Sequence, residues 1–387
     1  MEVGNRSFIK KINKSLILEK IIEYKSISRA DLAKVIGLNK ATVSSQVNEL
    51  LDKKLLYETQ SDYNSVGRRP VLLSINDSSG FILGIDFDYR KTKMVISNLS
   101  GNIVEQKNFY LNTEDYGKII SWLANQINNY VAKYSYSTYG LISCIIGVHG
   151  TVNKDEQIQL ITKFQWHNVS FKKDIENLIT IPVTVENNAN LSALAEKVFY
   201  YNSTSPLLSI SLSSGVGSGR IVNWEIDKGY QGFAGEMGHM IIYPDGPKCF
   251  CGQRGCWELF ATEVSLFNQL SNLLCEPILT IDDFKKISKS DNPVIQEAMQ
   301  KYIYYISIGL NNVINLYNPG IIVINSKVLA LYPNAIEQIT SHFSFNAHSY
   351  KKIVLSGLEE KACALGGCAL GIMNFFDITK LSLENMN

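Results

Sequence analysis

The first fifty residues alternate apolar and polar positions at helical spacing, which predicts three helices. The apolar residues that share one face of the first helix are Leu16, Ile17, Ile21 and Ile22. Ser28-Arg-Ala-Asp31 matches a capping box and predicts a second helix over residues 30–35, which Gly37 is well placed to end. Asn39 can cap a third helix, whose apolar positions are Val43, Val47, Leu50 and Leu51. Two short helices separated by a glycine turn are typical of a helix-turn-helix motif.

Two β-prone runs follow, at residues 55–59 and 71–75, and flank a polar loop that ends in Gly67-Arg-Arg-Pro70. This pattern predicts the wing of a winged helix, where Arg68 and Arg69 can enter a minor groove, because its negative potential favours guanidinium groups. The third helix should expose polar side chains suited to base edges and phosphates in a major groove. These residues are Lys40, Thr42, Ser44, Ser45, Gln46 and Asn48. A small helical domain that contacts other proteins is the alternative.

From residue 81 the pattern changes to strand-like runs separated by helices, which predicts an α/β body. The first group of strands is expected at residues 81–87, 93–97, 103–110 and 141–148, with a helix near 116–134. A similar group recurs after a helix at residues 191–199, with strands at 207–213 and 219–222 and a further strand at 321–324 that follows a long helix over 294–317. A last helix is expected over residues 362–376. Two related α/β halves follow from this repetition.

The charge distribution separates the two parts of the chain. Residues 1–75 hold 13 Lys and Arg against 8 Asp and Glu, a net charge of +5, whereas the remainder carries −4. A basic module of this kind is weak support for a polyanionic partner. No apolar run reaches the roughly 18 residues that a membrane span needs, and no secretory signal begins the chain. We therefore expect a cytoplasmic protein with no membrane segment, and buried, reduced thiols at Cys144, Cys275, Cys363 and Cys368.

Residues 235–258 concentrate four potential metal ligands: His239, Cys249, Cys251 and Cys256. Three thiolates and one imidazole at this compact spacing predict a closed tetrahedral zinc site, with glycines that let the backbone fold around the ion. Because four protein ligands fill the coordination sphere, the zinc is expected to be structural rather than catalytic. It would organise the neighbouring side chains of Glu236 and Glu258. Unrelated buried thiols and a surface histidine are the alternative.

The Glu-x-x-His and Cys-x-Cys-Gly-x-x-Gly-Cys-x-Glu blocks, at residues 236–239 and 249–258, resemble the signature of the ROK family of bacterial sugar kinases and sugar-responsive repressors. The resemblance runs from about residue 8 to the C-terminus. It is closest to the repressor branch, particularly to xylose repressors, through residues 38–48, 67–70 and 256–259. It implies that Glu236, His239 and Glu258 contact sugar hydroxyls, and that His239 serves both metal and ligand.

The resemblance also implies an N-terminal winged helix-turn-helix followed by a two-lobed α/β body of the actin-like ATPase type, which is ribonuclease H-like and sugar-kinase-like. The winged helix-turn-helix is expected over residues 1–78. The first lobe is expected over residues 79–187, completed by 361–387. The second lobe, with the zinc motif, is expected over residues 188–360.

Two departures from the kinase pattern predict that the chain is not an enzyme. Kinases of the family carry Asn-Asp-Ala-Asn, where the Asp takes the proton from the attacking sugar hydroxyl. Here Asn188 replaces that Asp, and an amide cannot act as a base, although Asn187 and Asn188 can still bind sugar hydroxyls. The first hairpin reads Asp86-Phe-Asp-Tyr-Arg-Lys91 in place of Asp-x-Gly-Gly-Thr-Lys, so the glycines that bring amides to phosphate are lost.

The expected function is a repressor of sugar utilisation genes that leaves its operator when a sugar binds in the cleft between the lobes. The partners would be palindromic operator DNA and a monosaccharide, with D-xylose the best match, and the repressor would be a homodimer or a tetramer. Glucose or an amino sugar is the alternative effector, and an ATP-dependent sugar kinase is the alternative of another class. His149 stands where the family usually has Pro, as either a pocket contact or an exposed loop side chain.

Overall fold

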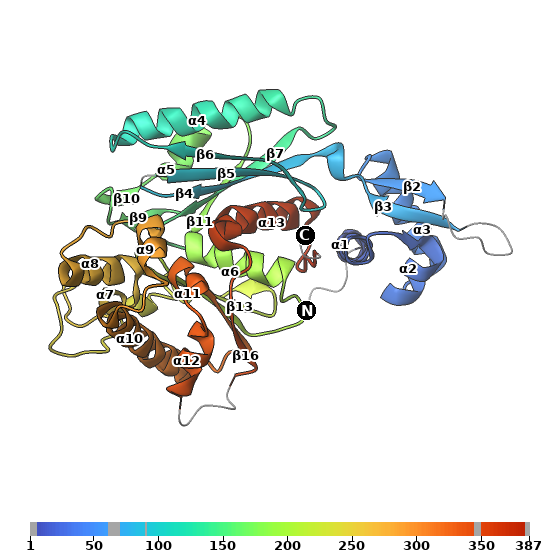
Figure 1. Cartoon of the computed structure of the whole chain (residues 1–387). Coiled ribbons are helices and arrows are strands. Elements are labelled where there is room, and N and C mark those ends of the chain that lie inside the picture. Colours follow the sequence, from blue (N-terminus) through green and yellow to red (C-terminus); the bar gives the residue numbers. More distant parts are fainter. Residues whose placement is uncertain (1–5, 61–69, 90, 344–349, 384–387) are drawn as a thin grey trace. The chain divides into compact units, whose positions relative to one another are not determined.

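The computed structural model describes residues 6–60, 70–89, 91–343 and 350–383 (Figure 1). The chain divides into two compact units. Unit 1 comprises residues 1–187, 197–202 and 363–387, and unit 2 comprises residues 188–196 and 203–362. Within the described ranges, no helix is both long enough and apolar enough to cross a membrane.

The N-terminal part of unit 1 contains three helices and a three-stranded antiparallel sheet of order β1-β3-β2. The elements are α1 (Arg6–Tyr24), β1 (Ile27–Ser28), α2 (Arg29–Ile36), α3 (Lys40–Asp52), β2 (Leu56–Gln60) and β3 (Val71–Ile75). The predicted helix ends are confirmed. Ser28 Oγ accepts a hydrogen bond from the Asp31 amide, Gly37 ends α2 with a φ of 71°, and Asn39 Oδ1 accepts from the Thr42 amide at 2.8 Å.

The hydrophobic face of α1 is shorter than predicted. Ile17, Ile21 and Ile22 are buried, but Leu16 is 37% exposed. The positions before Leu16 in α1 are largely exposed as well, so the sheet and the other two helices cover only the second half of α1. In α3, Val43, Val47 and Leu50 are buried as expected, and Leu51 is half-buried.

The segment that follows α13 (Ala362–Phe376) is tied to α1. Glu19 Oε1 accepts hydrogen bonds from the amide of Thr379 at 3.0 Å, its hydroxyl at 3.2 Å and the amide of Lys380 at 3.0 Å. Further along, the amide of Leu383 donates to the carbonyl of Val198, near the end of α6 (Asn188–Phe199), at 3.0 Å. The last described residues of the chain therefore hold α1 and the end of α6 within unit 1.

The main sheet of unit 1 has the order β11-β7-β4-β5-β6, in which β4, β5 and β6 are antiparallel and β7 and β11 run parallel to β4. Its strands are β4 (Phe81–Phe87), β5 (Lys91–Asn98), β6 (Ile103–Tyr110), β7 (Leu141–Val148) and β11 (Val183–Asn187). A small sheet follows β7, with β8 (Thr151–Val152), β9 (Ile158–Ile161) and β10 (Trp166–Val169).

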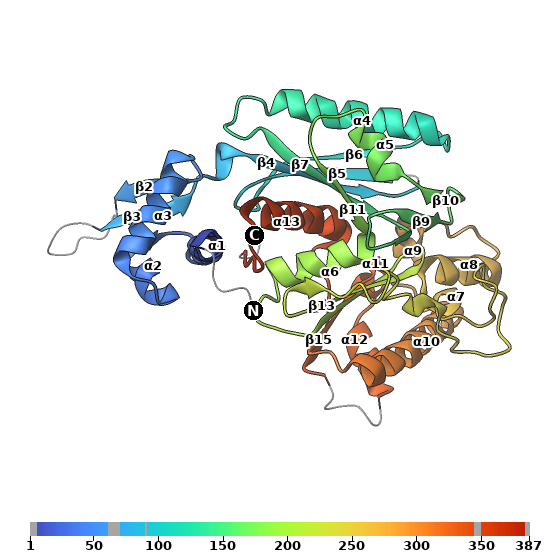
Figure 2. The same ribbon diagram turned by 180° about the vertical axis from the view of Figure 1, so that it is seen from behind.

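Helices cover both faces of this sheet, with α4 (Tyr116–Lys133) and α5 (Phe171–Glu176) on one side and α13 on the other (Figures 1 and 2). The approach of α13 depends on glycine. A Cβ at Gly84 in β4 would lie only 1.9 Å from the carbonyl oxygen of Ala364 in α13, so a larger residue would push the helix off the sheet.

Unit 2 repeats the strand plan of unit 1. Its sheet has the order β14-β13-β12-β15-β16, with three successive antiparallel strands and then two parallel ones. The strands are β12 (Leu207–Leu212), β13 (Val216–Val222), β14 (Glu225–Ile226), β15 (Ile321–Asn325) and β16 (Lys352–Leu355). The prediction of two related α/β halves is confirmed.

The helices of unit 2 pack around a large apolar core that includes residues of α8, α10 and β15. Apart from α6, whose residues 188–196 also belong to unit 2, these helices are α7 (Glu258–Ala261), α8 (Glu263–Leu274), α9 (Ile281–Ile287), α10 (Pro293–Tyr317), α11 (Lys327–Leu331) and α12 (Ala335–Ser341). One thiol departs from expectation. Cys275 was predicted to be buried but is exposed, because it caps the end of α8 in the left-handed conformation, with a φ of 54°.

Candidate functional site

The predicted metal ligands come together in unit 2. The nitrogen or sulfur atoms of His239, Cys249, Cys251 and Cys256 all lie within 4.8 Å of one another. His239 Nδ1 is 3.6 Å from Cys249 Sγ, and Cys251 Sγ is 3.6 Å from Cys256 Sγ. A zinc–sulfur bond of about 2.3 Å in a tetrahedron requires sulfurs about 3.8 Å apart, so the cluster can hold a metal ion of this kind.

The cysteine loop is shaped by its backbone. The amide of Cys249 donates to the carbonyl of Gln253 at 2.8 Å, and Gly252 turns the chain with a φ of 94°. Gly255 also has a positive φ, and a Cβ there would lie 1.7 Å from the carbonyl oxygen of Tyr243. Any other residue at Gly255 would push this segment away from residues 241–243, where Ile241 forms an isolated β-bridge with Cys256.

The predicted sugar contacts divide between the two units. Glu258 lies at the metal cluster, with Oε1 at 3.1 Å from Cys249 Sγ and 3.5 Å from His239 Nδ1. Glu236 is exposed and precedes the short turn that carries His239, and Asn188 is the first residue of α6. These residues belong to unit 2, whereas Asn187 ends β11 in unit 1, where its Nδ2 donates to the carbonyl of Gly150 at 3.0 Å.

The glycine-rich stretch over residues 213–219 has a packing role in unit 2. A Cβ at Gly219 would lie 2.4 Å from the carbonyl oxygen of Ala189 in α6. A Cβ at Gly235 would lie 2.6 Å from the carbonyl oxygen of Ser218, so the turn before His239 rests directly on this stretch. Close packing therefore accounts for Gly219 and Gly235 without a bound phosphate.

His149 is held by carboxylates of the first hairpin in unit 1. Its Nε2 lies 2.9 Å from Oδ1 of Asp86, and its Nδ1 lies 4.0 Å from Oδ1 of Asp88. Burial by itself would lower the pKa of His149, but the charge of Asp86, its hydrogen bond and the charge of Asp88 together raise it to about 9. This pairing could not be predicted from spacing, because 63 positions separate His149 from Asp86.

The predicted DNA-binding face of α3 needs one correction. Lys40, Ser45 and Asn48 are exposed, and Thr42 and Ser44 are half-buried. Gln46 is only 6% exposed, so its expected place on the outer face was wrong. Gln46 lies three residues after Val43 and four before Leu50, which puts it on the buried side of the helix. Arg68 and Arg69 lie outside the described residues.

A residue that sequence reasoning missed holds this face in place. Arg29, the first residue of α2, donates from Nη1 to Oδ1 of Asn48 at 2.8 Å and from Nη2 to Oε1 of Glu58 in β2 at 2.7 Å. One guanidinium therefore connects α2, α3 and β2. Such a connection depends on three elements meeting in space, so sequence spacing offers no signal for it.

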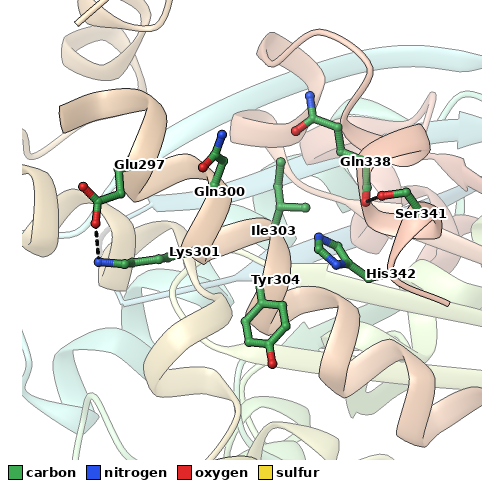
Figure 3. Close-up of a pocket in the computed structure, with 8 residues that line it drawn as sticks. All are labelled: Glu297, Gln300, Lys301, Ile303, Tyr304, Gln338, Ser341 and His342. Carbon is green, nitrogen blue, oxygen red and sulfur yellow. Dashed lines mark hydrogen bonds and ion pairs between the residues drawn. The ribbon is translucent and has the colours of Figure 1, made fainter. Parts of the chain in front are cut away.

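A pocket of about 470 Å³ lies elsewhere in unit 2, between α10 and the end of α12 (Figure 3). Polar residues such as Gln300 and Gln338 are among those that line it, and Lys301 is already paired with Glu297 at 2.7 Å. The predicted site residues do not line it. The metal cluster and its neighbours therefore remain the candidate site of unit 2.

Comparison with known proteins places the chain in a family. The model of the ROK family matches residues 82–373. The chain belongs to the ROK family. It is 34% identical to a Xylose repressor from Bacillus spizizenii over 387 residues, which cover 98% of this chain and all of the relative.

Two solved ROK structures are similar to this chain. One is the crystal structure of a ROK family transcriptional regulator described as a homolog of the E. coli MLC protein, with a TM-score of 0.81 and 26% identity, covering 95% of this chain and 97% of that one. The other is a ROK hexokinase from Thermus thermophilus, with a TM-score of 0.65 and 20% identity, covering 77% of this chain and 99% of that one. The hexokinase likeness confirms the sugar-kinase-like fold of the ROK body.

Proposed function

We propose that the chain is a transcriptional repressor that responds to a sugar, with D-xylose as the effector. The observation that carries the proposal is the 34% identity to a Xylose repressor over nearly the whole of both chains. This similarity includes the N-terminal helices and sheet, which a sugar kinase does not need for catalysis. A repressor also acts on DNA, so the cytoplasm of a bacterium is its expected location.

The N-terminal module, residues 1–78, is proposed as a winged helix-turn-helix that binds operator DNA. The helices α2 and α3, joined by the Gly37 turn, have the order of this motif, and β2 and β3 are the strands that flank a wing. One such module makes few base contacts, so a homodimer on a palindromic operator, or a tetramer of two such dimers, is expected. The proposed DNA contacts are Lys40, Thr42, Ser44, Ser45, Asn48, Arg68 and Arg69.

The proposed sugar contacts are Asn187, Asn188, Glu236, His239 and Glu258. A structural zinc ion held by His239 and the three cysteines would fix the turn that carries Glu236 and the start of α7 that carries Glu258. His239 Nδ1 faces Cys249 Sγ, so Nδ1 is the expected metal ligand, which leaves Nε2 for a sugar hydroxyl. Sugar binding then lowers DNA affinity through a coupling free energy between the two sites.

Phosphoryl transfer is not expected. Asn188 has no carboxylate to accept the proton of a sugar hydroxyl. In the first hairpin, Asp88 and Tyr89 stand in place of the two glycines that would let backbone amides approach a phosphate, and the Asp88 carboxylate repels a polyphosphate. We also propose the domain boundaries of the chain: the winged helix-turn-helix covers residues 1–78, the first lobe covers 79–187 with 361–387, and the second lobe covers 188–360.

The deciding experiment measures operator binding by fluorescence anisotropy while monosaccharides are added one at a time. D-Xylose is expected to release the wild-type protein from DNA, whereas Glu236→Ala should bind DNA normally and resist release. Release by glucose or an amino sugar alone would replace xylose as the effector. Normal release of Glu236→Ala by D-xylose would contradict the proposed sugar contacts, and ATP turnover with a monosaccharide would show that the protein is a kinase.

A further inference from the structure

Trp257 stands between a metal ligand and a proposed sugar ligand. It follows Cys256 directly and precedes Glu258, the first residue of α7. Its side chain is fully buried, whereas residues 250–254 of the preceding loop are exposed. The chain therefore enters the core of unit 2 at Gly255 and Cys256, directly before Trp257.

The indole of Trp257 fits into a notch in α10. A Cβ added at Gly309 would lie 2.0 Å from Cε2 of the indole and 2.3 Å from Cδ2, so only glycine leaves room for the ring. The indole Nε1 donates a hydrogen bond to the carbonyl oxygen of Tyr305, four residues earlier in α10, at 3.0 Å. Shape and hydrogen bonding thus specify one position for the ring on α10.

The other end of α7 is held as firmly. Glu263, two residues after Ala261, is 9% exposed, and its carboxylate accepts hydrogen bonds from the amide of Lys327 at 2.6 Å and the amide of Val328 at 3.3 Å. Its own amide donates to the carbonyl of Ser213 at 3.1 Å. A helix of four residues has little stability of its own, so the contacts at its two ends determine where it lies.

We infer that Trp257 is a positioning residue for the ligand site, and that Gly309 is the notch that receives it. The inference rests on the proposed function for its ligand, D-xylose. The anchored indole sets the start of α7, and with it the Glu258 carboxylate at 3.1 Å from Cys249 Sγ. The Gly309 notch and the Trp257 indole therefore control sugar affinity without touching the sugar.

The test compares Gly309→Ala and Trp257→Phe with a matched core variant, Met299→Ala. Met299 is buried in the same helix, ten residues and so about 15 Å before Gly309. Alanine is the better helix former, so any harm from Gly309→Ala comes from its contact with the indole. Gly309→Ala should raise the Kd for D-xylose at least tenfold at unchanged zinc content, and Trp257→Phe should raise it less. Met299→Ala should leave the Kd unchanged even though it lowers Tm.

A double variant tests whether Gly309 acts through Trp257. Because leucine is smaller than the indole, Gly309→Ala combined with Trp257→Leu should bind D-xylose no more weakly than Trp257→Leu alone. Additive losses of affinity in the double variant would overturn the direct fit of ring and notch. So would wild-type affinity in both Gly309→Ala and Trp257→Phe.

Amide hydrogen exchange over residues 257–263 gives a measure that needs no sugar. Gly309→Ala should accelerate exchange in this segment, and Met299→Ala should not. If the wild-type protein binds no monosaccharide, the proposed function fails. The hydrogen exchange of residues 257–263 then decides by itself whether Trp257 is a positioning residue. Faster exchange in Gly309→Ala then supports that role, and unchanged exchange overturns it.

Discussion

The imidazole Nε2 of His149, directly after β7, lies 2.9 Å from Oδ1 of Asp86 in β4. The pKa of about 9 keeps His149 protonated at neutral pH. Burial, reinforced by the charge of Asp86, also raises the pKa of the Cys363 thiol, so that side chain stays neutral. This end of the unit 1 sheet is therefore organised around an internal ion pair.

The first prediction is a pH-dependent contribution of His149 to stability. Because the pKa in the folded protein, about 9, exceeds the ordinary value of 6.5, the stabilisation is fully present below pH 6.5 and is lost as the pH rises through 9. The difference in Tm between the wild type and His149→Gln should amount to a few degrees at pH 6 and shrink steadily towards pH 10. Thermal unfolding across this range measures it.

Asp86→Asn provides the control for that prediction. Without the carboxylate, burial dominates and the pKa of His149 should fall below 6.5, which an NMR titration of the imidazole would report. A Tm difference for His149→Gln that is the same at pH 6 and pH 10 would contradict the ion pair.

A second prediction concerns the metal. Purified protein should contain about one zinc per chain, and Cys251→Ser should reduce the zinc content and Tm together, because a structural zinc contributes folding energy. Cys275→Ser is the matched control, since Cys275 is also exposed but lies outside the cluster. Elemental analysis gives the content. Wild-type protein that lacks zinc yet is folded and releases DNA on addition of sugar would rule the site out.

The third prediction separates two neighbours in α3. Ser45 is exposed, so Ser45→Ala should change the preference among operator sequences by about 1 kcal/mol and leave Tm unchanged. Gln46 is buried, so Gln46→Ala should lower Tm while the relative preference among operators stays the same. Anisotropy titrations on a panel of operator variants distinguish the two outcomes. If Gln46→Ala changed the preference among operator sequences without lowering Tm, the Gln46 side chain would have to contact the DNA.

The fourth prediction concerns the proposed wing. Replacing both Arg68 and Arg69 by Ala should weaken binding to all DNA sequences alike and lower the slope of log affinity against log salt by about 2, since each phosphate contact contributes about 0.9. Sugar affinity should not change. Lys25→Ala, which also removes a positive charge from the N-terminal module, serves as the comparison. An equally large loss of DNA affinity in Lys25→Ala would show that the arginines act only through the overall charge of the module.

A fifth prediction addresses catalysis. Asn188→Asp would place a carboxylate at the position that the resemblance to ROK kinases assigns to the general base, a group that typically contributes about two to four orders of magnitude in rate. The proposed loss of the phosphate-binding turn in the first hairpin remains, so the variant should phosphorylate no monosaccharide at a useful rate, although sugar should still raise its Tm. A coupled ATPase assay with each monosaccharide checks this, and brisk turnover would show that the hairpin does bind nucleotide.

Sequence reasoning succeeded where the determining contacts are local. Ser28, Gly37 and Asn39 act on residues within one helical turn, and all three helix ends were predicted correctly. The four metal ligands were found because they lie in one short segment. Most strands of the two halves were also predicted to within a few residues, because buried strands of an α/β fold are nearly continuous apolar runs.

The remaining features depend on contacts that spacing does not encode. The strand β1 has two residues and exists only because it pairs with Leu72 and Leu73 of β3. The burial of Gln46 depends on what covers α3, and the His149–Asp86 pair joins two strands distant in sequence. The fit of Trp257 to Gly309 likewise requires α10 to be in place.

The four metal ligands occupy only residues 239–256, so the loop that must close to assemble them is short. Closing a loop of this length costs little entropy, and an unfolded chain can therefore also capture the ion. Zinc bound to the unfolded chain reduces the net gain in stability that the ion provides, while it favours early assembly of this segment during refolding. Chelation should consequently slow the recovery of native protein more than it lowers the equilibrium stability.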